Sequence, residues 1–282
     1  MRLWITVMLA LIAAACSPIA LFNTVTPKDG ATGPATRAIA YGEGLRQKLD
    51  IYPAPAASPR PVIVFIYGGA WNSGRRQDYA WAARALAAQG FVVVVPDYRL
   101  APEHPFPAFV DDAAAATAWA YRNAARFGGD PDRMVLMGHS AGAHIAMMVA
   151  LDRRLLARGE VPASAVRGVI GLAGAYRFDP KEEGVLRDAF GAYPEPEAVQ
   201  PVTFVRADAP PALLLHGDAD TRVLMRNSHR LGRDLVAAGA HAEVKIYPGV
   251  DHAGIALALS RPFRNRAPTL EDVTAFATKV TQ

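Results

Sequence analysis

The sequence contains almost no cysteine, and it lacks the short motifs of several large enzyme classes. Cys16 is the only cysteine among 282 residues, so no disulfide bond can form within the chain. No GxGxxG, GKS, GKT or HExxH pattern occurs, which leaves no sequence signal for a dinucleotide, a nucleoside triphosphate or a zinc ion. We therefore expect no cofactor and no resident metal.

The chain also lacks clustered positive charge. Its formal net charge is +4, but no run of four Lys or Arg residues occurs, and aromatic residues are not interleaved with basic ones. Internal repeats are missing as well. This pattern is typical of a solvated surface and predicts no binding of nucleic acid.

An uncharged, mostly apolar run lies at the N-terminus and is too short to span a bilayer. Arg2 precedes residues 3–15, which end in small side chains. We expect residues 1–15 to be a signal peptide. The chain is then secreted across the inner membrane into the periplasm.

The sequence AAAC at residues 13–16 resembles a bacterial lipobox. This resemblance implies that Cys16 is lipidated and, because Ser17 follows it, that the anchor lies in the outer membrane. Simple cleavage after Ala15 is the alternative. Residues 16–38 are rich in small residues, Pro and Gly, and we expect them to form a tether or loosely packed arm.

Beyond residue 39 the chain alternates short apolar runs with longer helical segments. With 51% hydrophobic residues, a chain of this length can bury a large core. Continuous apolar strands separated by helices predict one α/β domain over residues 39–282, with a mainly parallel central sheet and helices on both faces. The expected strands include residues 62–66, 91–95, 134–137, 169–172, 212–215 and 244–247.

The pentapeptide GHSAG at residues 138–142 is the most informative motif in the chain. It follows a strand candidate and precedes residues 143–158, which have helical character. A serine between a strand and a helix stands in a strained, tight turn, where the two flanking glycines avoid collisions. Its hydroxyl is then exposed at a helix N-terminus, beside the Ala141 amide. The pattern predicts that Ser140 is a nucleophile.

Asp220 and His252 are the candidates for the acid and the base that a nucleophilic serine needs. Both follow strand candidates, and the carboxyl ends of parallel strands are where α/β proteins build their sites. The chain order Ser, Asp, His is that of α/β-hydrolases. We expect His252 to accept the proton of Ser140 and Asp220 to orient the imidazole. Asp218 is the alternative acid.

The other histidines are expected to have structural or surface positions. His216 should pack or hydrogen-bond at a strand end, and His139 and His144 should line the site or lie on the helix surface. No suitably placed acid and nucleophile accompany the three remaining histidines, which are His104, His229 and His241.

A Gly-Gly pair follows another strand candidate. Gly68 and Gly69 come after residues 62–66 and before a helix candidate at residues 78–89. Glycines at such a place let backbone amides approach a substrate oxygen. We expect an oxyanion hole built from Gly68, Gly69 and Ala141, while turn chemistry alone is the alternative explanation for the glycines.

Two further segments carry a family resemblance. Residues 97–108, DYRLAPEHPFPA, closely resemble the segment that follows the HGG loop in hormone-sensitive-lipase-like carboxylesterases. With FGGDP at residues 127–131, the likeness runs from about residue 40 to the C-terminus. It implies an α/β-hydrolase fold and a cofactor-free hydrolase of carboxylic esters. The site residues that it implies are Ser140, Asp220, His252, Gly68, Gly69 and Ala141.

Tyr67 departs from the family pattern, which usually has His at that position. The sequence GGAW at residues 68–71 is more similar to the HGGxW branch, which is shared with kynurenine formamidases and small bacterial esterases. The family His is thought to brace the loop. We expect Tyr67 to replace it by ring stacking and by hydrogen bonding through its hydroxyl.

The prolines in residues 97–108 exclude a regular helix or strand, so we expect a rigid loop there. Arg99 and Glu103 are expected to pair across this loop. Asp111 or Asp112 is expected to cap the helix that follows.

The sequence therefore predicts a serine carboxylesterase that hydrolyses short-chain esters of small molecules through an acyl-enzyme. An arylformamidase and a non-catalytic, envelope-tethered binding protein on the same scaffold are the alternatives, and the oligomeric state is left open. Residues 176–211 are expected to form a cap-like insertion that determines substrate specificity. Four of its side chains either roof a pocket or pack a small insertion, namely Phe178, Leu186, Phe190 and Tyr193.

Overall fold

The computed structural model describes residues 18–30, 35–55 and 59–282, and its centre is an eight-stranded sheet. The strand order is β1-β2-β4-β3-β5-β6-β7-β8, with β2 antiparallel to both of its neighbours and every later pair parallel. The strands are β1 Thr36–Ala40, β2 Lys48–Tyr52, β3 Arg60–Ile66, β4 Val92–Pro96, β5 Gly129–His139, β6 Val166–Leu172, β7 Ala212–Gly217 and β8 Ala242–Tyr247. This architecture confirms the predicted α/β-hydrolase fold.

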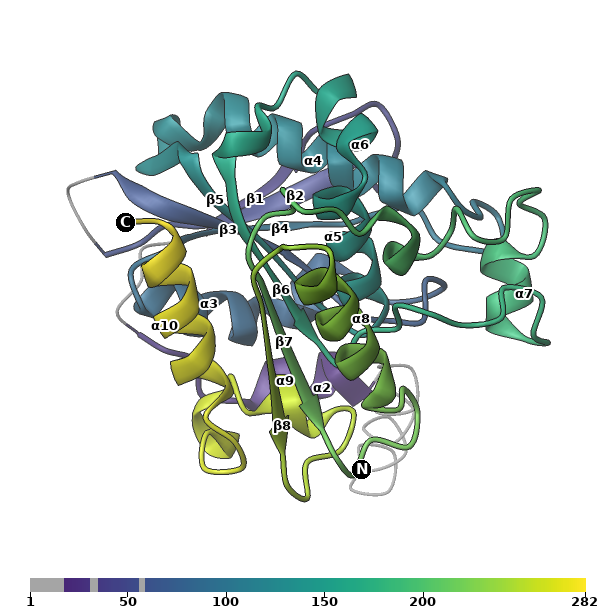
Figure 1. Cartoon of the computed structure of the whole chain (residues 1–282). Coiled ribbons are helices and arrows are strands. Elements are labelled where there is room, and N and C mark those ends of the chain that lie inside the picture. The colour runs from purple at the N-terminus through teal and green to yellow at the C-terminus, as the bar shows by residue number, and fades with distance from the viewer. Residues whose placement is uncertain (1–17, 31–34, 56–58) are drawn as a thin grey trace, which may run out of the picture.

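Helices cover both faces of the sheet. Figure 1 shows α4, α5 and α8 on one face and α3 and α10 on the other. The α-helices are α2 Pro18–Val25, α3 Ala80–Ala88, α4 Ala108–Asn123, α5 Ala141–Leu151, α6 Arg153–Arg158, α7 Val185–Phe190, α8 Arg226–Ala237, α9 Gly254–Leu257 and α10 Thr269–Val280. Short 3₁₀ helices are η1 Arg76–Tyr79, η2 Ala124–Phe127, η3 Ala163–Ala165, η4 Pro201–Phe204 and η5 Arg261–Phe263.

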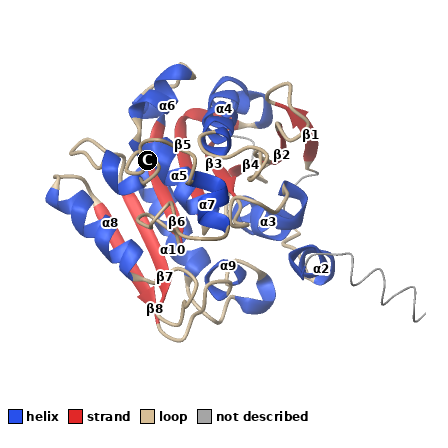
Figure 2. Cartoon of the chain, turned by 90° about the vertical axis from the view of Figure 1, so that its right-hand side faces the viewer, coloured by secondary structure: helices blue, strands red, loops and turns tan. Residues whose placement is uncertain are grey.

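The central strands are apolar along their whole length because both of their faces are covered. Every residue of β4, with the sequence VVVVP, is buried, and β-branched side chains suit such a doubly covered strand. Helix α5 is buried at all of its residues, since it lies between the sheet and residues of the 176–211 insertion. Figure 2 looks onto the side where α7 lies, with α8 and α3 to either side of it.

The helical segment predicted at residues 143–158 is two helices. Helix α5 ends at Leu151, and α6 begins at Arg153. Between them, the Asp152 side chain accepts a hydrogen bond from the Arg154 amide at 3.1 Å. An N-cap of this kind satisfies an amide at the start of the new helix, which explains the break.

The expected pairing of Arg99 with Glu103 is wrong. Arg99 Nη2 lies 2.8 Å from Asp112 Oδ1, and the Arg99 amide donates to Asp112 Oδ2 at 2.8 Å. Asp112 is buried, so its carboxylate requires a close charged partner, whereas Glu103 is exposed. The expected cap by Asp111 or Asp112 is also wrong: Pro107 is the N-cap residue and no side chain caps the helix, although Asp111 lies in the first turn of α4.

Within residues 16–38, which are expected to be a tether or loosely packed arm, the structure has helix α2 and the start of strand β1. Residues Pro18–Val25 form α2, in which the Phe22 ring packs edge-on against Trp81 with centroids 5.2 Å apart. Asn23 Nδ2 donates to the Gln77 carbonyl at 2.9 Å, and the Trp81 amide donates to Asn23 Oδ1 at 3.2 Å. One aromatic contact and two hydrogen bonds therefore hold this segment on the domain.

The predicted signal peptide at residues 1–15 and the predicted lipidation site Cys16 lie outside the described residues. Within the described ranges, none of the helices combines the length and the apolar character needed to cross a membrane.

Candidate active site

Ser140 occupies the sharp turn that the GHSAG motif predicts. It stands between β5 and α5 with φ 55° and ψ −121°, a conformation that is strained for a residue with a side chain. A Cβ atom on Gly138 would lie 2.1 Å from the Gly142 carbonyl oxygen, and one on Gly142 would lie 2.1 Å from the Ile66 carbonyl oxygen. Only glycine fits at both positions, and this close packing holds Ser140 at the N-terminus of α5.

The structure brings Ser140, His252 and Asp220 together at the carboxyl edge of the sheet. Ser140 Oγ lies 2.8 Å from His252 Nε2, and His252 Nδ1 lies 2.7 Å from Asp220 Oδ2. The carboxylate can only accept, so Nδ1 carries the proton and Nε2 accepts from the serine hydroxyl. These three side chains follow β5, β8 and β7, so the fold supplies each from a different strand end.

Asp220 is held as a carboxylate by several donors. Its Oδ1 accepts from the amides of Arg222 and Val223, each at 2.9 Å. Burial raises the pKa of the Asp220 carboxyl, but the hydrogen bonds from His252 and from these amides outweigh it, so its pKa lies below the usual value. Asp218, the alternative acid, instead accepts from the Gly249 amide at 2.7 Å.

His216 hydrogen-bonds at the end of β7, as expected. Its Nε2 donates to the Val223 carbonyl at 2.7 Å and lies 3.2 Å from Asp220 Oδ2, while Nδ1 lies 2.8 Å from Ser228 Oγ. Burial lowers the pKa of His216, so the ring stays neutral beside Asp220. The histidines at 104, 229 and 241 are exposed.

His144 is buried inside the molecule and is not on a helix surface. Its Nδ1 accepts from Trp71 Nε1 at 3.2 Å, and its Nε2 donates to the Val199 carbonyl at 2.8 Å. The ring thus joins three segments: the loop after β3, helix α5 and the insertion at 176–211. The sequence gives no signal for this contact because its members are far apart along the chain.

The loop after β3 lies against Ser140. A Cβ on Gly68 would lie 3.3 Å from Ser140 Cβ, and one on Gly69, where φ is 144°, would lie 2.1 Å from the Ser73 carbonyl oxygen. Glycine is therefore required for this loop to pass so close. No acceptor within the described residues binds the amides of Gly68, Gly69 or Ala141.

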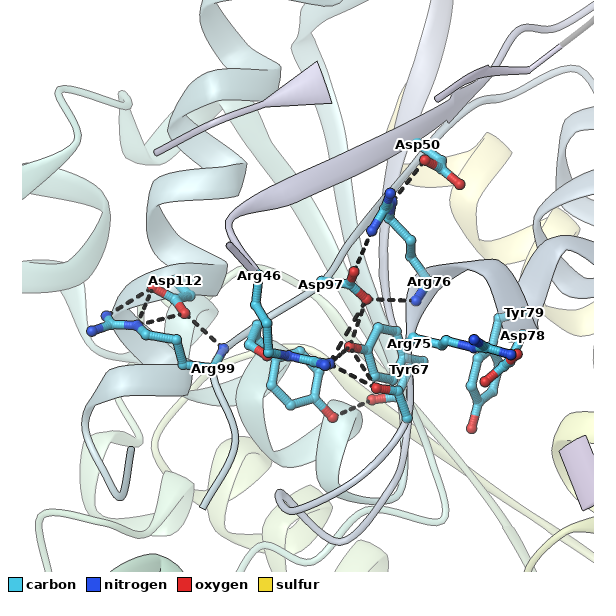
Figure 3. A network of polar contacts seen from close by, with 12 residues as sticks. Arg46, Asp50, Tyr67, Arg75, Arg76, Asp78, Tyr79, Asp97, Arg99 and Asp112 are labelled. Atoms are coloured by element: carbon cyan, nitrogen blue, oxygen red, sulfur yellow. Dashed lines mark hydrogen bonds and ion pairs between the residues drawn. The ribbon is translucent and has the colours of Figure 1, made fainter. Parts of the chain in front are cut away.

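Tyr67 braces this loop as expected from its replacement of histidine. Its ring stacks on Tyr79 and Tyr98 with centroids 5.3 Å and 4.7 Å away. Its hydroxyl donates to Asp97 Oδ1 at 2.9 Å and accepts from Arg46 Nη2 at 2.9 Å. Figure 3 shows these contacts within a larger network of polar side chains. The stacking and hydroxyl bonds predicted for Tyr67 are both present.

A cavity of about 900 Å³ opens above Ser140 and His252. Of the four insertion side chains considered, Phe178 and Leu186 line it, whereas Phe190 and Tyr193 pack elsewhere: Phe190 against Trp71 and Tyr193 against Phe106. Sequence patterns gave no signal for four further lining residues, which are Ile19, Trp81, Ala256 and Leu257.

Acid should destabilise the fold through its buried histidines. Burial lowers the pKa of His144 from 6.5 to about 4, so below pH 6.5 the unfolded chain takes up a proton that the folded chain does not. This contribution is fully present above about pH 6.5 and is lost as pH falls toward about 4. In urea unfolding at several pH values, His144→Gln should reduce the slope of the free energy of unfolding against pH by up to about 1.4 kcal/mol per pH unit. His104→Gln, at an exposed site, should leave it unchanged, and equal slopes for all three proteins would contradict the expectation.

Comparison with known proteins assigns the family. The BD-FAE family model matches residues 49–235, which is more than half of the chain. The chain belongs to the BD-FAE family. This BD-FAE protein is 31% identical to the isoprenylcysteine alpha-carbonyl methylesterase ICME of Arabidopsis thaliana, over 95% of this chain and 68% of the relative. It is 30% identical to Esterase LipC of Mycobacterium tuberculosis, over 84% of this chain and 68% of that protein.

The BD-FAE protein spans only 61% of the length of another relative, the probable isoprenylcysteine alpha-carbonyl methylesterase ICMEL1 of Oryza sativa, with 32% identity. Among solved structures, a butyrate-bound thermophilic esterase of Thermogutta terrifontis matches with a TM-score of 0.72 and 26% identity, over 87% of this chain and 94% of that one. A truncated carbohydrate esterase from gut microbiota matches with a TM-score of 0.78 over 91% and 99%, and at 23% identity it supports the fold alone.

Proposed function

We propose that this chain hydrolyses carboxylic esters with Ser140 as nucleophile, His252 as base and Asp220 as orienting acid. The observation that carries the proposal is the hydrogen-bonded series from Ser140 Oγ through the imidazole to Asp220, at 2.8 and 2.7 Å, beneath the open cavity. A nucleophile, a base and an orienting group within hydrogen-bonding reach are the minimum that acyl transfer needs. The esterase names of two relatives add support.

The reaction follows from this arrangement in two halves. Ser140 Oγ attacks the ester carbonyl carbon while its proton passes to His252 Nε2. The carbonyl oxygen becomes an oxyanion that accepts from the unpaired amides of the Gly68-Gly69 loop and of Ala141. The bond to the alcohol oxygen then breaks as that oxygen takes the proton from His252, which leaves an acyl group on Ser140. In the second half, water attacks the acyl carbon while His252 takes a proton from it. The bond to Ser140 Oγ then breaks as Oγ takes that proton back, and the carboxylic acid is released.

We further propose that the substrates carry short acyl groups. Phe178, which lines the cavity, packs against Phe190 and Trp71 with ring centroids 4.9 and 5.8 Å apart, so aromatic rings form this part of the cavity wall. The Thermogutta terrifontis esterase with the same fold was solved with butyrate bound. We therefore assign short-chain esters as the preferred substrates.

Hydrolysis rates of p-nitrophenyl acetate, butyrate, octanoate and dodecanoate test this proposal. The two short esters are expected to have the higher kcat/KM. N-Formylkynurenine serves as the competing substrate, because the same groups attack an amide. Hydrolysis of the formamide with no ester hydrolysis above background would favour the arylformamidase, and activity toward neither would favour a binding protein.

Ile19 should limit the length of one substrate chain, because it lines the cavity from α2. Ile19→Trp would fill part of that space and should lower kcat/KM for long esters roughly tenfold to a hundredfold, with little change for acetate. Two ester series, one with longer acyl and one with longer alcohol groups, will show which part lies there. Leu21→Trp, at an exposed position on the same helix, is the matched control. Identical profiles for both variants would refute the role of Ile19.

We also propose that residues 1–15 direct export and that Cys16 carries lipid, on the sequence resemblance described above. Palmitate labelling in a Gram-negative host should mark the wild-type chain, and Cys16→Ala should abolish the label and release the chain from the membrane fraction. A released, unlabelled wild-type chain would favour simple cleavage after Ala15.

A further inference from the structure

His139, the residue before the proposed nucleophile, makes a contact that the reaction scheme above does not use. It is the last residue of β5, only 8% of it is exposed, and it lines the cavity. Its Nε2 lies 2.9 Å from the main-chain carbonyl oxygen of His252, and the two imidazole rings have centroids 5.0 Å apart. The side chain next to the nucleophile therefore contacts the backbone of the base.

The direction of this hydrogen bond fixes the state of the His139 ring. A carbonyl oxygen only accepts, so Nε2 carries the proton and Nδ1 is left as an acceptor. Burial, together with the neighbouring His252, lowers the pKa of His139 to about 3, so the ring is neutral wherever the reaction can run. The donor to the His252 carbonyl is thus present throughout that range.

The other ring nitrogen shows that packing alone does not account for a histidine here. Nδ1 is buried and has no hydrogen-bond partner among the described residues. Nδ1 faces Gly68 closely, since a Cβ atom added to Gly68 would lie 3.0 Å from this nitrogen. An unpaired buried acceptor is unfavourable, and a phenylalanine ring would fill the same space without it. What phenylalanine cannot supply is the hydrogen bond to His252.

The loop that carries His252 has few other restraints toward β5. Its nearby hydrogen bonds run within the loop, from the Gly254 amide to Asp251, or to the end of β7, from the Ala219 amide to the Val250 carbonyl. Asp220 holds the imidazole from the β7 side. Apart from the Ser140–His252 bond itself, the His139 bond is the one hydrogen bond within the described residues that links β5 or Ser140 to the loop carrying His252.

We propose that His139 is a positioning residue, which holds the His252 backbone so that the imidazole stays within hydrogen-bonding distance of Ser140. This inference rests on the proposed function. Proton transfer between the two side chains depends steeply on their separation, and a displacement of about 1 Å can lower the rate about a hundredfold. A donor on the residue adjacent to the nucleophile ties the position of the base to that of the nucleophile itself.

Three substitutions test this role, and two of them form a matched polar pair. His139→Gln can place an amide nitrogen near the position of Nε2, whereas His139→Asn reaches only to the position of Nδ1. His139→Phe keeps a ring and removes both nitrogens. We expect kcat for p-nitrophenyl butyrate to fall roughly tenfold to a hundredfold in the Phe and Asn variants, with KM within about twofold of wild type. The Gln variant should keep kcat within about threefold.

Thermal unfolding separates positioning from stability. His139→Phe removes an unpaired buried acceptor, so its midpoint should equal or exceed that of wild type while its kcat falls. If that variant does not fold, the comparison of Gln with Asn decides by itself. Equal kcat values for Gln and Asn, or a wild-type kcat in a folded Phe variant, would overturn the inference.

The two proposals fail in different ways. Loss of activity in Ser140→Ala together with full activity in the His139 variants would refute only the positioning role. Full activity in Ser140→Ala would refute the proposed function, whatever the His139 variants do.

Discussion

Replacing Ser140 with alanine is expected to lower kcat for p-nitrophenyl butyrate by roughly four to six orders of magnitude. Without the hydroxyl, no acyl-enzyme can form, and only the cavity and the amides near Ser140 remain to assist attack by water. The fold should persist, because Ala141 and the glycines that shape the turn are unchanged. Steady-state hydrolysis and circular dichroism of the purified variant measure both parts of this expectation.

Ser164 supplies the control for this substitution. It is exposed in η3, just before the amino end of β6, whereas Ser140 follows the carboxyl end of the adjacent parallel strand β5. Ser164→Ala should keep the wild-type rate. If Ser140→Ala retained even a tenth of the wild-type kcat in a preparation free of wild-type protein, Ser140 would not be the nucleophile.

Asp220→Asn is expected to lower kcat by about four orders of magnitude. The carboxylate accepts from His252 Nδ1 at 2.7 Å, which leaves Nε2 free to accept the serine proton. An asparagine that turns its amide toward the ring favours the opposite tautomer, in which Nε2 carries a proton and can no longer act as a base. KM should change little, since Asp220 is buried behind His252 and does not line the cavity above Ser140.

Asp218→Asn is the matched control, because it removes the same charge two residues away. Asp218 accepts from the Gly249 amide at 2.7 Å, and the asparagine oxygen can accept that same hydrogen bond. We expect kcat to stay within about threefold of wild type, given the small effect of most surface substitutions. A larger loss for Asp218→Asn than for Asp220→Asn would reverse the assignment of the acid.

The position of Ser140 could be predicted from sequence because its constraints are local. The turn is set by two glycines within two residues, and the flanking strand and helix have their own composition signals. Asp220 and Asp218 could not be separated with the same security. Both follow β7, and their different hydrogen bonds depend on a loop that is distant in sequence. The Gly249 amide of that loop donates to Asp218.

Contacts between segments far apart in the chain had no sequence signal. Helix α2 has the short sequence PIALFNTV, for which composition predicts a tether or loosely packed arm. The contact of Phe22 with Trp81, which holds the helix on the domain, has no local signal. The bond from His139 to the His252 carbonyl joins residues 113 positions apart and uses a main-chain acceptor, which every residue possesses. The pairing of Arg99 likewise depends on how α4 packs beside the loop at residues 97–107. This packing brings Asp112, and not Glu103, within reach of Arg99. Such contacts follow from the packed fold rather than from local pattern.

Covalent labelling tests the central claim most directly. The full-length chain is treated with a fluorophosphonate probe, digested, and analysed by mass spectrometry for the modified residue. The account predicts a single adduct on Ser140 that forms in step with the loss of esterase activity and does not form in Ser140→Ala. Full inactivation with the adduct on another residue, or an active chain with no adduct at all, would contradict it.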